Sequence, residues 1–359
     1  MNTMENIFIG KEIWLELMKF IASDKFSSLF ILTDENVNKN CLPLLLDECE
    51  ALKQATVIEI PAGEEEKNIT TAAKILSVLL ENNADRKCLL INLGGGVVSD
   101  IGGFVASVYK RGICFINIPT TLLSMVDASV GGKNAINFLE RKNIIGTFTH
   151  PEAIFIFPDF VKSLGKRDVR SGYAEIIKHL LLSDAERWKK VLSDPKFLTD
   201  ESNIEELIDH SVKFKIKITS DDFRESGKRA ILNFGHTFGH ALESYSFSGN
   251  NPLTHGEAIA VGMIGELFLS NKLTGFPISE MEATVLFIKK LFYEINLNCS
   301  AEDLIPFLYA DKKNARDKIA FSLLKSPGEP AGIFYPEIES IVQSLIYMID
   351  EFSRMPVND

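Results

Sequence analysis

Between residues 27 and 160, short apolar runs alternate with segments of helical periodicity, and this alternation restricts the fold more than any other feature. The runs are rich in β-branched residues and predict strands, and the segments between them predict helices. Because such alternation builds a mostly parallel sheet with helices on both faces, we expect a Rossmann-like α/β domain. The predicted strands are 28–32, 56–60, 88–93, 113–118 and 153–157, and the predicted helices are 72–82 and 101–110.

The pattern changes after about residue 170, where amphipathic helices follow one another and only residues 318–324 suggest a strand. A chain of 359 residues is too long for one small core. We therefore expect two domains, a sheet domain over 1–170 and an all-helical domain over 171–359. The predicted helices of the second domain are 172–188, 204–218, 235–244, 256–271, 279–293 and 337–352.

The acidic balance of the chain limits its partners. With a formal net charge of −11, it lacks the basic surface that broad nucleic-acid binding needs, so a local basic cluster must hold any anionic ligand. The longest apolar stretch is far shorter than the roughly 20 residues of a membrane span, and the amino terminus has no signal-peptide pattern. Five cysteines without CxxC spacing predict reduced thiols. We expect a cytoplasmic protein that binds neither membranes nor nucleic acid.

A glycine-rich turn follows the third predicted strand. In Leu93-Gly-Gly-Gly-Val-Val-Ser-Asp100, glycines let the backbone approach a pyrophosphate, and the amides at the start of the next helix supply donors. The fingerprint is incomplete because Ser99 occupies its last position, so a purely steric turn remains an alternative. Residues 62–67 precede a helix and could offer carboxylates to ribose hydroxyls, and Pro119-Thr120-Thr121 ends a strand at the carboxyl edge where open α/β sheets bind ligands. A capped helix start and a simple turn would also explain them.

A second glycine loop precedes two lysines. Val130-Gly-Gly-Lys133 is followed by Lys142 and Asn143, which together could hold a phosphate, although lysines in loops are usually just solvated.

Three of the six histidines fall within twenty residues. His236 and His240 are four residues apart, which on a helix places both rings on one face where they can share a metal ion. HTFGH lacks the glutamate of an HExxH peptidase helix, and such pairs also occur by coincidence. The candidate third ligands are Glu175, His255 and Glu257. Three protein ligands would leave positions open for substrate, so a catalytic metal is favoured over a structural one.

Several long motifs occur in a familiar order. IPTTLLSMVDASVGGKNAIN, KNIIGTFTHP, SGYAEIIKH, KRAILNFGHTFGHA, THGEAIAVGM and DKKNA resemble the 3-dehydroquinate synthase family, from about residue 33 to 314. The resemblance implies an NAD-dependent, zinc-dependent lyase of the shikimate pathway of aromatic amino acid biosynthesis. Its sugar phosphate substrate would be 3-deoxy-D-arabino-heptulosonate 7-phosphate, converted to 3-dehydroquinate and phosphate. A homodimer is common in this family.

The resemblance also implies a role for individual residues. Glu175, His236 and His255 would bind the metal, whereas His240 would face the substrate. The substrate contacts would be Arg111, Lys133, Asn143, Lys178, Lys215, Arg229, Asn233 and one of Lys312 or Lys313. The NAD contacts would be Asp34, Gly63, Glu64, Lys67, Gly95, Gly96, Val97, Asp100, Thr120, Thr121, Asp127, Lys142, Phe160 and Ser163.

The implied reaction oxidises C5 of the substrate transiently, eliminates phosphate, returns the hydride and closes the ring by an aldol step. The ligand set also accepts cobalt or iron. The sequence departs from the family at Ser99, at Leu180 and in an extended loop at 246–252, and beyond about residue 325 it matches poorly.

Three other functions remain open from the sequence. Another sugar phosphate cyclase would share the cofactor and metal, but Arg229 and Asn233 favour a substrate that carries a carboxylate. A polyol dehydrogenase of the glycerol dehydrogenase type would release NADH. A scaffold protein on a decayed enzyme fold is disfavoured, because decay removes costly polar groups first and Glu175, His236 and His255 are all present.

Overall fold

The computed structural model describes residues 6–22, 25–139, 141–249, 251–309 and 318–353. The chain divides into two compact units. Unit 1 contains residues 1–165 and 208–224, and unit 2 contains 166–207 and 225–359. The predicted cut at 170/171 differs from this division in two places. Residues 166–170 belong to unit 2, and residues 208–224 belong to unit 1 because most of one long helix packs with the sheet unit. Which group each domain binds stays a prediction.

Unit 1 is built on a six-stranded parallel sheet with the strand order β1-β8-β5-β4-β2-β3. Every strand predicted from the sequence is present, and β1 is an additional edge strand that the sequence did not indicate. The strands are β1 (Asn6–Ile9), β2 (Leu29–Asp34), β3 (Thr56–Ile60), β4 (Leu89–Gly94), β5 (Cys114–Pro119) and β8 (Ala153–Ile156).

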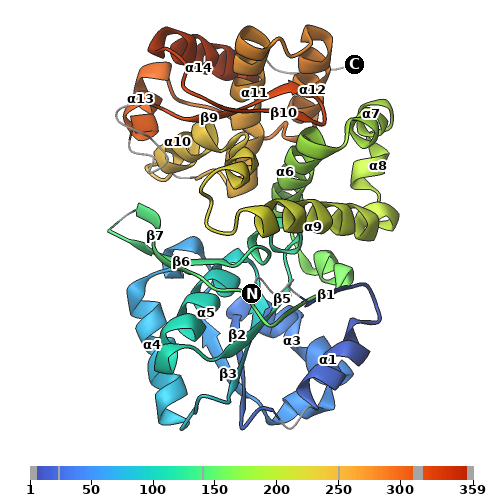
Figure 1. Ribbon diagram of the computed structural model, residues 1–359, viewed down its shortest axis with the longest axis vertical. Helices are drawn as coiled ribbons and strands as arrows, with labels where there is room; N and C mark the ends of the chain where they lie inside the picture. The colour runs from blue at the N-terminus through green and yellow to red at the C-terminus, as the bar shows by residue number, and fades with distance from the viewer. Residues whose placement is uncertain (1–5, 23–24, 140, 250, 310–317, 354–359) are drawn as a thin grey trace. The chain divides into compact units, whose positions relative to one another are not determined.

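Helices cover both faces of this sheet, as the alternation predicts. Figure 1 shows α4 and α5 on one side and α1 and α3 on the other. The direction of the strand connections reverses between the neighbours β2 and β4, so the carboxyl ends of these strands form the switch point where open sheets bind ligands. The helices are α1 (Ile13–Ile21), α2 (Glu35–Asn40), α3 (Leu42–Glu48), α4 (Ile69–Glu81) and α5 (Gly96–Val108).

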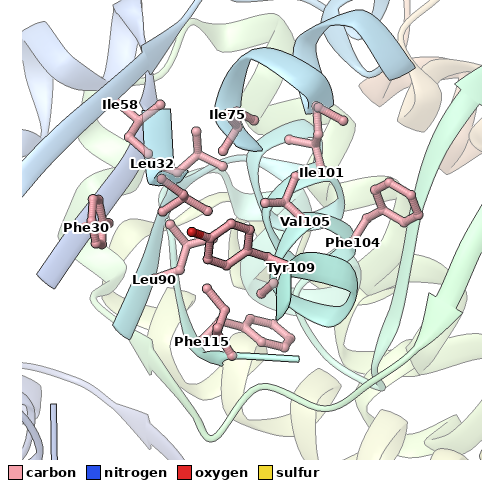
Figure 2. Close-up of a cluster of buried hydrophobic side chains, with 14 of the residues drawn as sticks. Phe30, Leu32, Ile58, Ile75, Leu90, Ile101, Phe104, Val105, Tyr109 and Phe115 are labelled. Atoms are coloured by element: carbon pink, nitrogen blue, oxygen red, sulfur yellow. The ribbon is translucent and has the colours of Figure 1, made fainter. Parts of the chain in front are cut away.

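The core of unit 1 lies between the sheet and the helices α4 and α5. Figure 2 shows Phe30, Leu90 and Phe115 from three strands close to Ile75 of α4 and Val105 of α5. All of these side chains are buried. Removing this much apolar surface from water, at roughly 25 cal/mol per Å², fixes the two helices and therefore the turns that precede them.

A β-hairpin lies beside α5 and was not predicted. Its strands are β6 (Lys133–Phe138) and β7 (Arg141–Phe148), which pair antiparallel and contact α5. The glycines and lysines of this segment predict a phosphate-binding loop, but Lys133 begins one strand and Asn143 lies in the other. Short helical turns complete unit 1 at Glu50–Gln54, Glu64–Glu66, Tyr109–Arg111, Ser124–Ala128 and Pro158–Ser163.

Unit 2 is helical and is organised around α11 (His255–Thr274). This helix is buried on nearly every side from Gly256 to Ser270 and contacts α6, α10, α12, α14 and β9, as expected for a helix that is apolar all round. The other elements are α6 (Lys166–Ser183), α7 (Ala185–Ser193), α8 (Lys196–Thr199), η6 (Glu201–Asn203), η7 (Lys228–Asn233), α10 (His236–Ser246), α12 (Ile278–Leu291), α13 (Ala301–Tyr309), β9 (Phe321–Ser326), β10 (Glu329–Phe334) and α14 (Ile338–Ser353).

One predicted helix of unit 2 is divided in the structure, and one predicted strand is confirmed. The helix predicted over 172–188 is two helices, because Asp184 ends α6 and caps α7 by accepting a hydrogen bond from the Arg187 amide. The strand-like segment 318–324 is confirmed as β9, which pairs with β10 in a hairpin among the helices. The helix α9 (Ile204–Asp221) runs from unit 2 into unit 1. Within the described ranges, every helix is too short or too polar to span a bilayer.

Candidate functional site

The carboxyl edge of the sheet carries the predicted cofactor residues of unit 1. Asp34 ends β2, Gly94 ends β4, and Thr120 follows β5, so parallel pairing brings the three loops to one edge. Asp34 is the N-cap of α2, and its Oδ1 accepts hydrogen bonds of 3.0 Å from the amides of Asn36 and Val37. Burial raises the pKa of Asp34, although these two amides lower it.

The glycine turn between β4 and α5 is tightly packed. A Cβ atom on Gly95 would lie 3.0 Å from Cγ2 of Thr121, so the loop after β5 closes on the start of α5. Gly95 is the N-cap of α5 and makes no side-chain cap, which leaves the first amides of this helix for a ligand. The buried hydroxyls of Ser99 and Thr120 have no hydrogen-bond partner among the described residues.

A buried lysine joins the 62–67 loop to α5. Nζ of Lys67 lies 2.6 Å from Oδ2 of Asp100 and 3.8 Å from Oε1 of Glu64. Nζ of Lys142, on β7, lies 3.8 Å from the same oxygen of Glu64. Burial raises the pKa of Asp100, and the Lys67 ammonium opposes this rise. Four predicted cofactor residues therefore form one charged cluster.

The loop that contains Glu64 starts with a backbone conformation that only glycine adopts readily. Gly63 has φ of 128°, and a Cβ atom there would also overlap the carboxylate of Glu65. Asn137 of β6 holds the loop by donating from Nδ2 to Oε1 of Glu64 over 2.9 Å. The hairpin that the sequence analysis missed thus positions Glu64.

Asp127 and Lys215 form another ion pair between predicted site residues of unit 1. Nζ of Lys215, on α9, lies 2.8 Å from Oδ1 of Asp127 and donates to its carbonyl oxygen over 2.6 Å. A predicted substrate contact and a predicted cofactor contact are therefore direct neighbours.

Three predicted site residues of unit 1, Phe160, Ser163 and Arg111, lie outside the loops described above. Phe160 is buried against Trp14 and Phe157, and Ser163 donates to the Phe160 carbonyl oxygen over 2.7 Å. Arg111 follows the carboxyl end of α5 and precedes β5, so it lies about 20 Å along that helix from the glycine turn. Their roles in binding stay predictions.

In unit 2, one carboxylate and two imidazoles converge. Oε1 of Glu175, on α6, lies 3.7 Å from Nε2 of His236 and 3.5 Å from Nε2 of His255. The three ligand atoms lie within 4.8 Å of one another, and Glu175 is fully buried. Lys178, one turn later on α6, forms an ion pair with the other oxygen of Glu175.

The second nitrogen of each ring faces an acceptor. Nδ1 of His236 lies 3.2 Å from the carbonyl oxygen of Phe234, and Nδ1 of His255 lies 3.7 Å from Oε2 of Glu243. Burial lowers the pKa of His255, but the carboxylates of Glu175 and Glu243 outweigh it and raise this pKa to about 9. Glu243 was missed by the sequence analysis, although its place seven residues after His236 on one helix was a usable signal.

The structure places the other candidate ligands, His240 and Glu257, outside the group around Glu175. His236 and His240 are neighbours on α10, with ring centroids 5.3 Å apart, but His240 is not in the group that surrounds Glu175. Glu257 has other partners, because it caps α11 with Thr254 and forms a bidentate ion pair with Arg167 at 2.6 and 2.7 Å. Capping and metal binding would both use the carboxylate oxygens of Glu257, and these oxygens already have partners.

The start of α10 depends on a buried carboxylate of α11. Gly235 has φ of 80°, and its amide and that of Thr237 donate to Glu266 over 2.8 and 3.0 Å. Nearby, Arg229 is buried in η7, and Nδ2 of Asn233 donates to Glu225 over 2.8 Å. Lys312 and Lys313 lie outside the described residues.

Comparisons with known proteins agree over nearly the whole chain. A family model described as 3-dehydroquinate synthase N-terminal matches residues 57–171, and one described as 3-dehydroquinate synthase C-terminal matches 172–314. A 3-dehydroquinate synthase of Parabacteroides distasonis is 40% identical over 97% of this chain and 99% of its own length. One of Leptospira interrogans is 40% identical over 85% and 84%.

Solved structures share the fold. A 2-deoxy-scyllo-inosose synthase complexed with carbaglucose-6-phosphate, NAD+ and Co2+ superposes with a TM-score of 0.85 at 25% identity, covering 95% of this chain and 96% of that one. A 2-epi-5-epi-valiolone synthase from Streptomyces hygroscopicus, with NAD+ and Zn2+ bound, gives 0.84 at 24% identity, covering 98% of each chain.

Proposed function

The chain belongs to the 3-dehydroquinate synthase family, and from this premise we propose which of its residues carry the reaction. It is an NAD- and divalent-metal-dependent lyase that converts 3-deoxy-D-arabino-heptulosonate 7-phosphate to 3-dehydroquinate and phosphate. The observation that carries the residue assignment is the convergence of Glu175, His236 and His255 in unit 2.

These three side chains fit a divalent ion. In a tetrahedral zinc site the ligand atoms lie about 3.4 Å apart, and the two Nε2 atoms lie 3.5 and 3.7 Å from Oε1 of Glu175. Each Nδ1 faces an acceptor, the arrangement that metal-binding histidines usually have. Glu175, His236 and His255 would therefore hold the metal, with Zn2+ or Co2+ as the occupant. A bound ion supplies Lewis acidity toward the hydroxyl groups of the substrate.

His240 would transfer a proton, and Lys178 would bind an anionic group of the substrate. His240 lies one turn from His236 on α10 and is outside the ligand group, so its ring would face a substrate hydroxyl and not the metal. The ordinary pKa range of histidine suits proton transfer near neutral pH. Lys178 is buried beside Glu175 and would place an ammonium next to the anionic substrate.

The phosphate and the carboxylate of the substrate need separate cationic contacts. Arg229 offers a planar fork suited to a carboxylate, and Asn233 is held in place by Glu225. Lys215 is oriented by Asp127. We assign the remaining substrate contacts to Arg111, Lys133, Asn143 and Lys312.

The carboxyl edge of the sheet would bind NAD, which accepts a hydride and returns it within one turnover. The first amides of α5 would face the pyrophosphate, and the buried, unpartnered hydroxyl of Thr120 fits a hydrogen bond to a polar ligand. Asp34, at the end of β2, would bind a ribose hydroxyl. We accordingly assign NAD binding to residues 1–170, and the metal and much of the substrate to 171–359.

Phosphate release from the heptulosonate phosphate tests these assignments. Addition of a strong chelator, or the substitutions Glu175→Gln, His236→Ala and His255→Ala, should each abolish release, and added zinc should restore only the chelated wild type. His210→Gln, which changes a histidine of α9 outside the metal group, is the matched control and should keep full activity. Full activity in any of the three ligand variants would contradict the assignment.

We also propose a cytoplasmic homodimer without nucleic-acid partners. All five cysteines are free thiols, which suits a reducing compartment. The β6–β7 hairpin exposes Phe138, Leu139 and Phe148, an apolar surface that a second copy could cover. Sedimentation equilibrium should give twice the chain mass, and a monomer at all concentrations would contradict the dimer.

A further inference from the structure

We propose that Glu243 is a positioning residue that sets the orientation of His255 for metal binding, an inference that rests on the metal site proposed above. His255 is the first residue of α11, and the capping box of Thr254 and Glu257 fixes its backbone. The backbone does not fix the ring, which can turn about its side-chain torsions. A contact with the ring itself must decide which nitrogen faces Glu175.

Glu243 supplies that contact from a different helix. Oε2 of Glu243, on α10, lies 3.7 Å from Nδ1 of His255, while Nε2 on the opposite side of the ring lies 3.5 Å from Glu175. The two carboxylates therefore hold the imidazole from both ends. When Nδ1 carries its proton toward Glu243, the lone pair of Nε2 is directed at the metal position.

The same helix supplies a ligand and its support. Glu243 follows His236 by seven residues, which is two turns of α10, so both side chains leave the helix on one face. His236 needs no second carboxylate, because the carbonyl oxygen of Phe234 already faces its Nδ1 at 3.2 Å. Each imidazole thus has one acceptor behind it, a main-chain oxygen for His236 and a side-chain oxygen for His255.

The Glu243 carboxylate is buried and therefore needs compensating partners. Glu243 is 4% exposed. A carboxylate withdrawn from water is costly unless charged or hydrogen-bonded groups compensate it. The ring of His255 lies against it and can provide this compensation.

Zinc affinity measured by competition with a chromophoric chelator tests the proposal without relying on activity. Glu243→Ala should weaken zinc binding about 10- to 100-fold, the usual effect of losing a group that orients a ligand. Glu243→Gln should fall between alanine and wild type, because its amide oxygen still accepts the Nδ1 proton. Glu282→Gln, which changes an exposed carboxylate of α12, is the matched control and should bind zinc like wild type.

A double-mutant cycle separates positioning from general stability. If Glu243 acts through His255, then adding Glu243→Ala to His255→Ala should cost no further affinity. An unchanged affinity in Glu243→Ala, or an equal loss in the presence and absence of His255, would overturn the proposal. Glu243→Gln preserves volume and keeps the test open if the alanine variant does not fold.

The assumed metal site has its own control. Glu175→Gln should lose zinc affinity whatever Glu243 does. If Glu175→Gln loses affinity and Glu243→Ala does not, only the positioning role fails. If Glu175→Gln binds zinc like wild type, the metal site fails and the role of Glu243 fails with it.

Discussion

At the scale of single residues, buried charged side chains lie at the proposed cofactor and metal sites of this chain. Glu175 is fully buried and Lys178 is 1% exposed, and burying such groups is unfavourable unless they compensate one another. Both sit where two imidazoles also converge. In unit 1, Lys67 is equally enclosed between two carboxylates at the carboxyl edge of the sheet.

Replacing Lys67 should lower the free energy of unfolding, because it leaves a partly buried carboxylate without its partner. Lys67→Met leaves the Asp100 carboxylate, whose side chain is 18% exposed, without its ammonium partner. Breaking an ion pair this deep costs about 3 kcal/mol, so the free energy of unfolding in urea should fall by that order. Lys74→Met, at an exposed position of α4, should unfold like wild type. Coincident unfolding curves for all three proteins would show that the pair contributes nothing.

The thiols should be slow to react in the folded protein. Burial raises the pKa of Cys114 to about 12, with Glu152 adding to the rise, and burial raises the pKa values of Cys88 and Cys299 to about 11. Because a raised pKa depletes the reactive thiolate, labelling at pH 8 should be much slower than in urea, where thiols ionise near 8.5. Labelling should accelerate as the pH approaches 11. Equal rates in the folded and unfolded protein at pH 8 would contradict the burial.

At the scale of elements, the position of the proposed metal ligands depends on how α6 and α11 meet. Gly256 donates its amide to Oγ of Ser171 over 3.0 Å, and Arg167 reaches from α6 to Glu257 in the first turn of α11. These contacts lie directly beside His255 and one turn before Glu175. The two ligands thus share a rigid junction, although they are far apart in the sequence.

A methyl group at this junction should loosen both the fold and the metal site. In Gly256→Ala, the added Cβ would lie 2.1 Å from the carbonyl oxygen of Ser171, so α11 must move away from α6. Overpacking of this kind costs about 1–3 kcal/mol, and we expect a lower melting temperature together with weaker zinc binding.

Gly227→Ala is the matched control for that substitution. Gly227 has no atom within 4 Å of an added Cβ and no positive φ, so this variant should keep the stability and zinc affinity of wild type. The importance of the junction would be refuted if Gly256→Ala melted at the wild-type temperature.

At the scale of the whole molecule, the activity combines a redox cofactor with a reaction that has no net redox change. The family converts a sugar phosphate to a carbocycle, and NAD is regenerated in each turnover. A polyol dehydrogenase with a similar fold would instead release NADH. The two classes are therefore distinguished by their products and not by their architecture.

Nicotinamide absorbance followed during turnover makes this distinction. With heptulosonate phosphate and catalytic NAD, phosphate should accumulate over many turnovers while absorbance shows no net NADH. A chelator should stop phosphate release without producing NADH. Formation of NADH in proportion to phosphate would contradict the cyclase assignment.

The sequence alone determined the parallel sheet, the helical character of the second half and the family. Local periodicity records which face of each element is apolar, and that is enough to distinguish strands from helices. Ordered motifs such as HTFGH and THGE then identified the family. The resemblance carried by these motifs also implied Glu175, His236 and His255 as the metal ligands.

Only the tertiary structure decided which partners meet. Spacing paired His236 with His240, because sequence distance describes one helix and cannot register contacts between helices. The packing of α6, α10 and α11 instead brings His255 to Glu175 and Glu243 to the opposite side of the His255 ring, while Glu257 caps α11. The β6–β7 hairpin and the Lys67–Asp100 pair were likewise invisible, since each joins segments whose approach depends on burial in the completed fold.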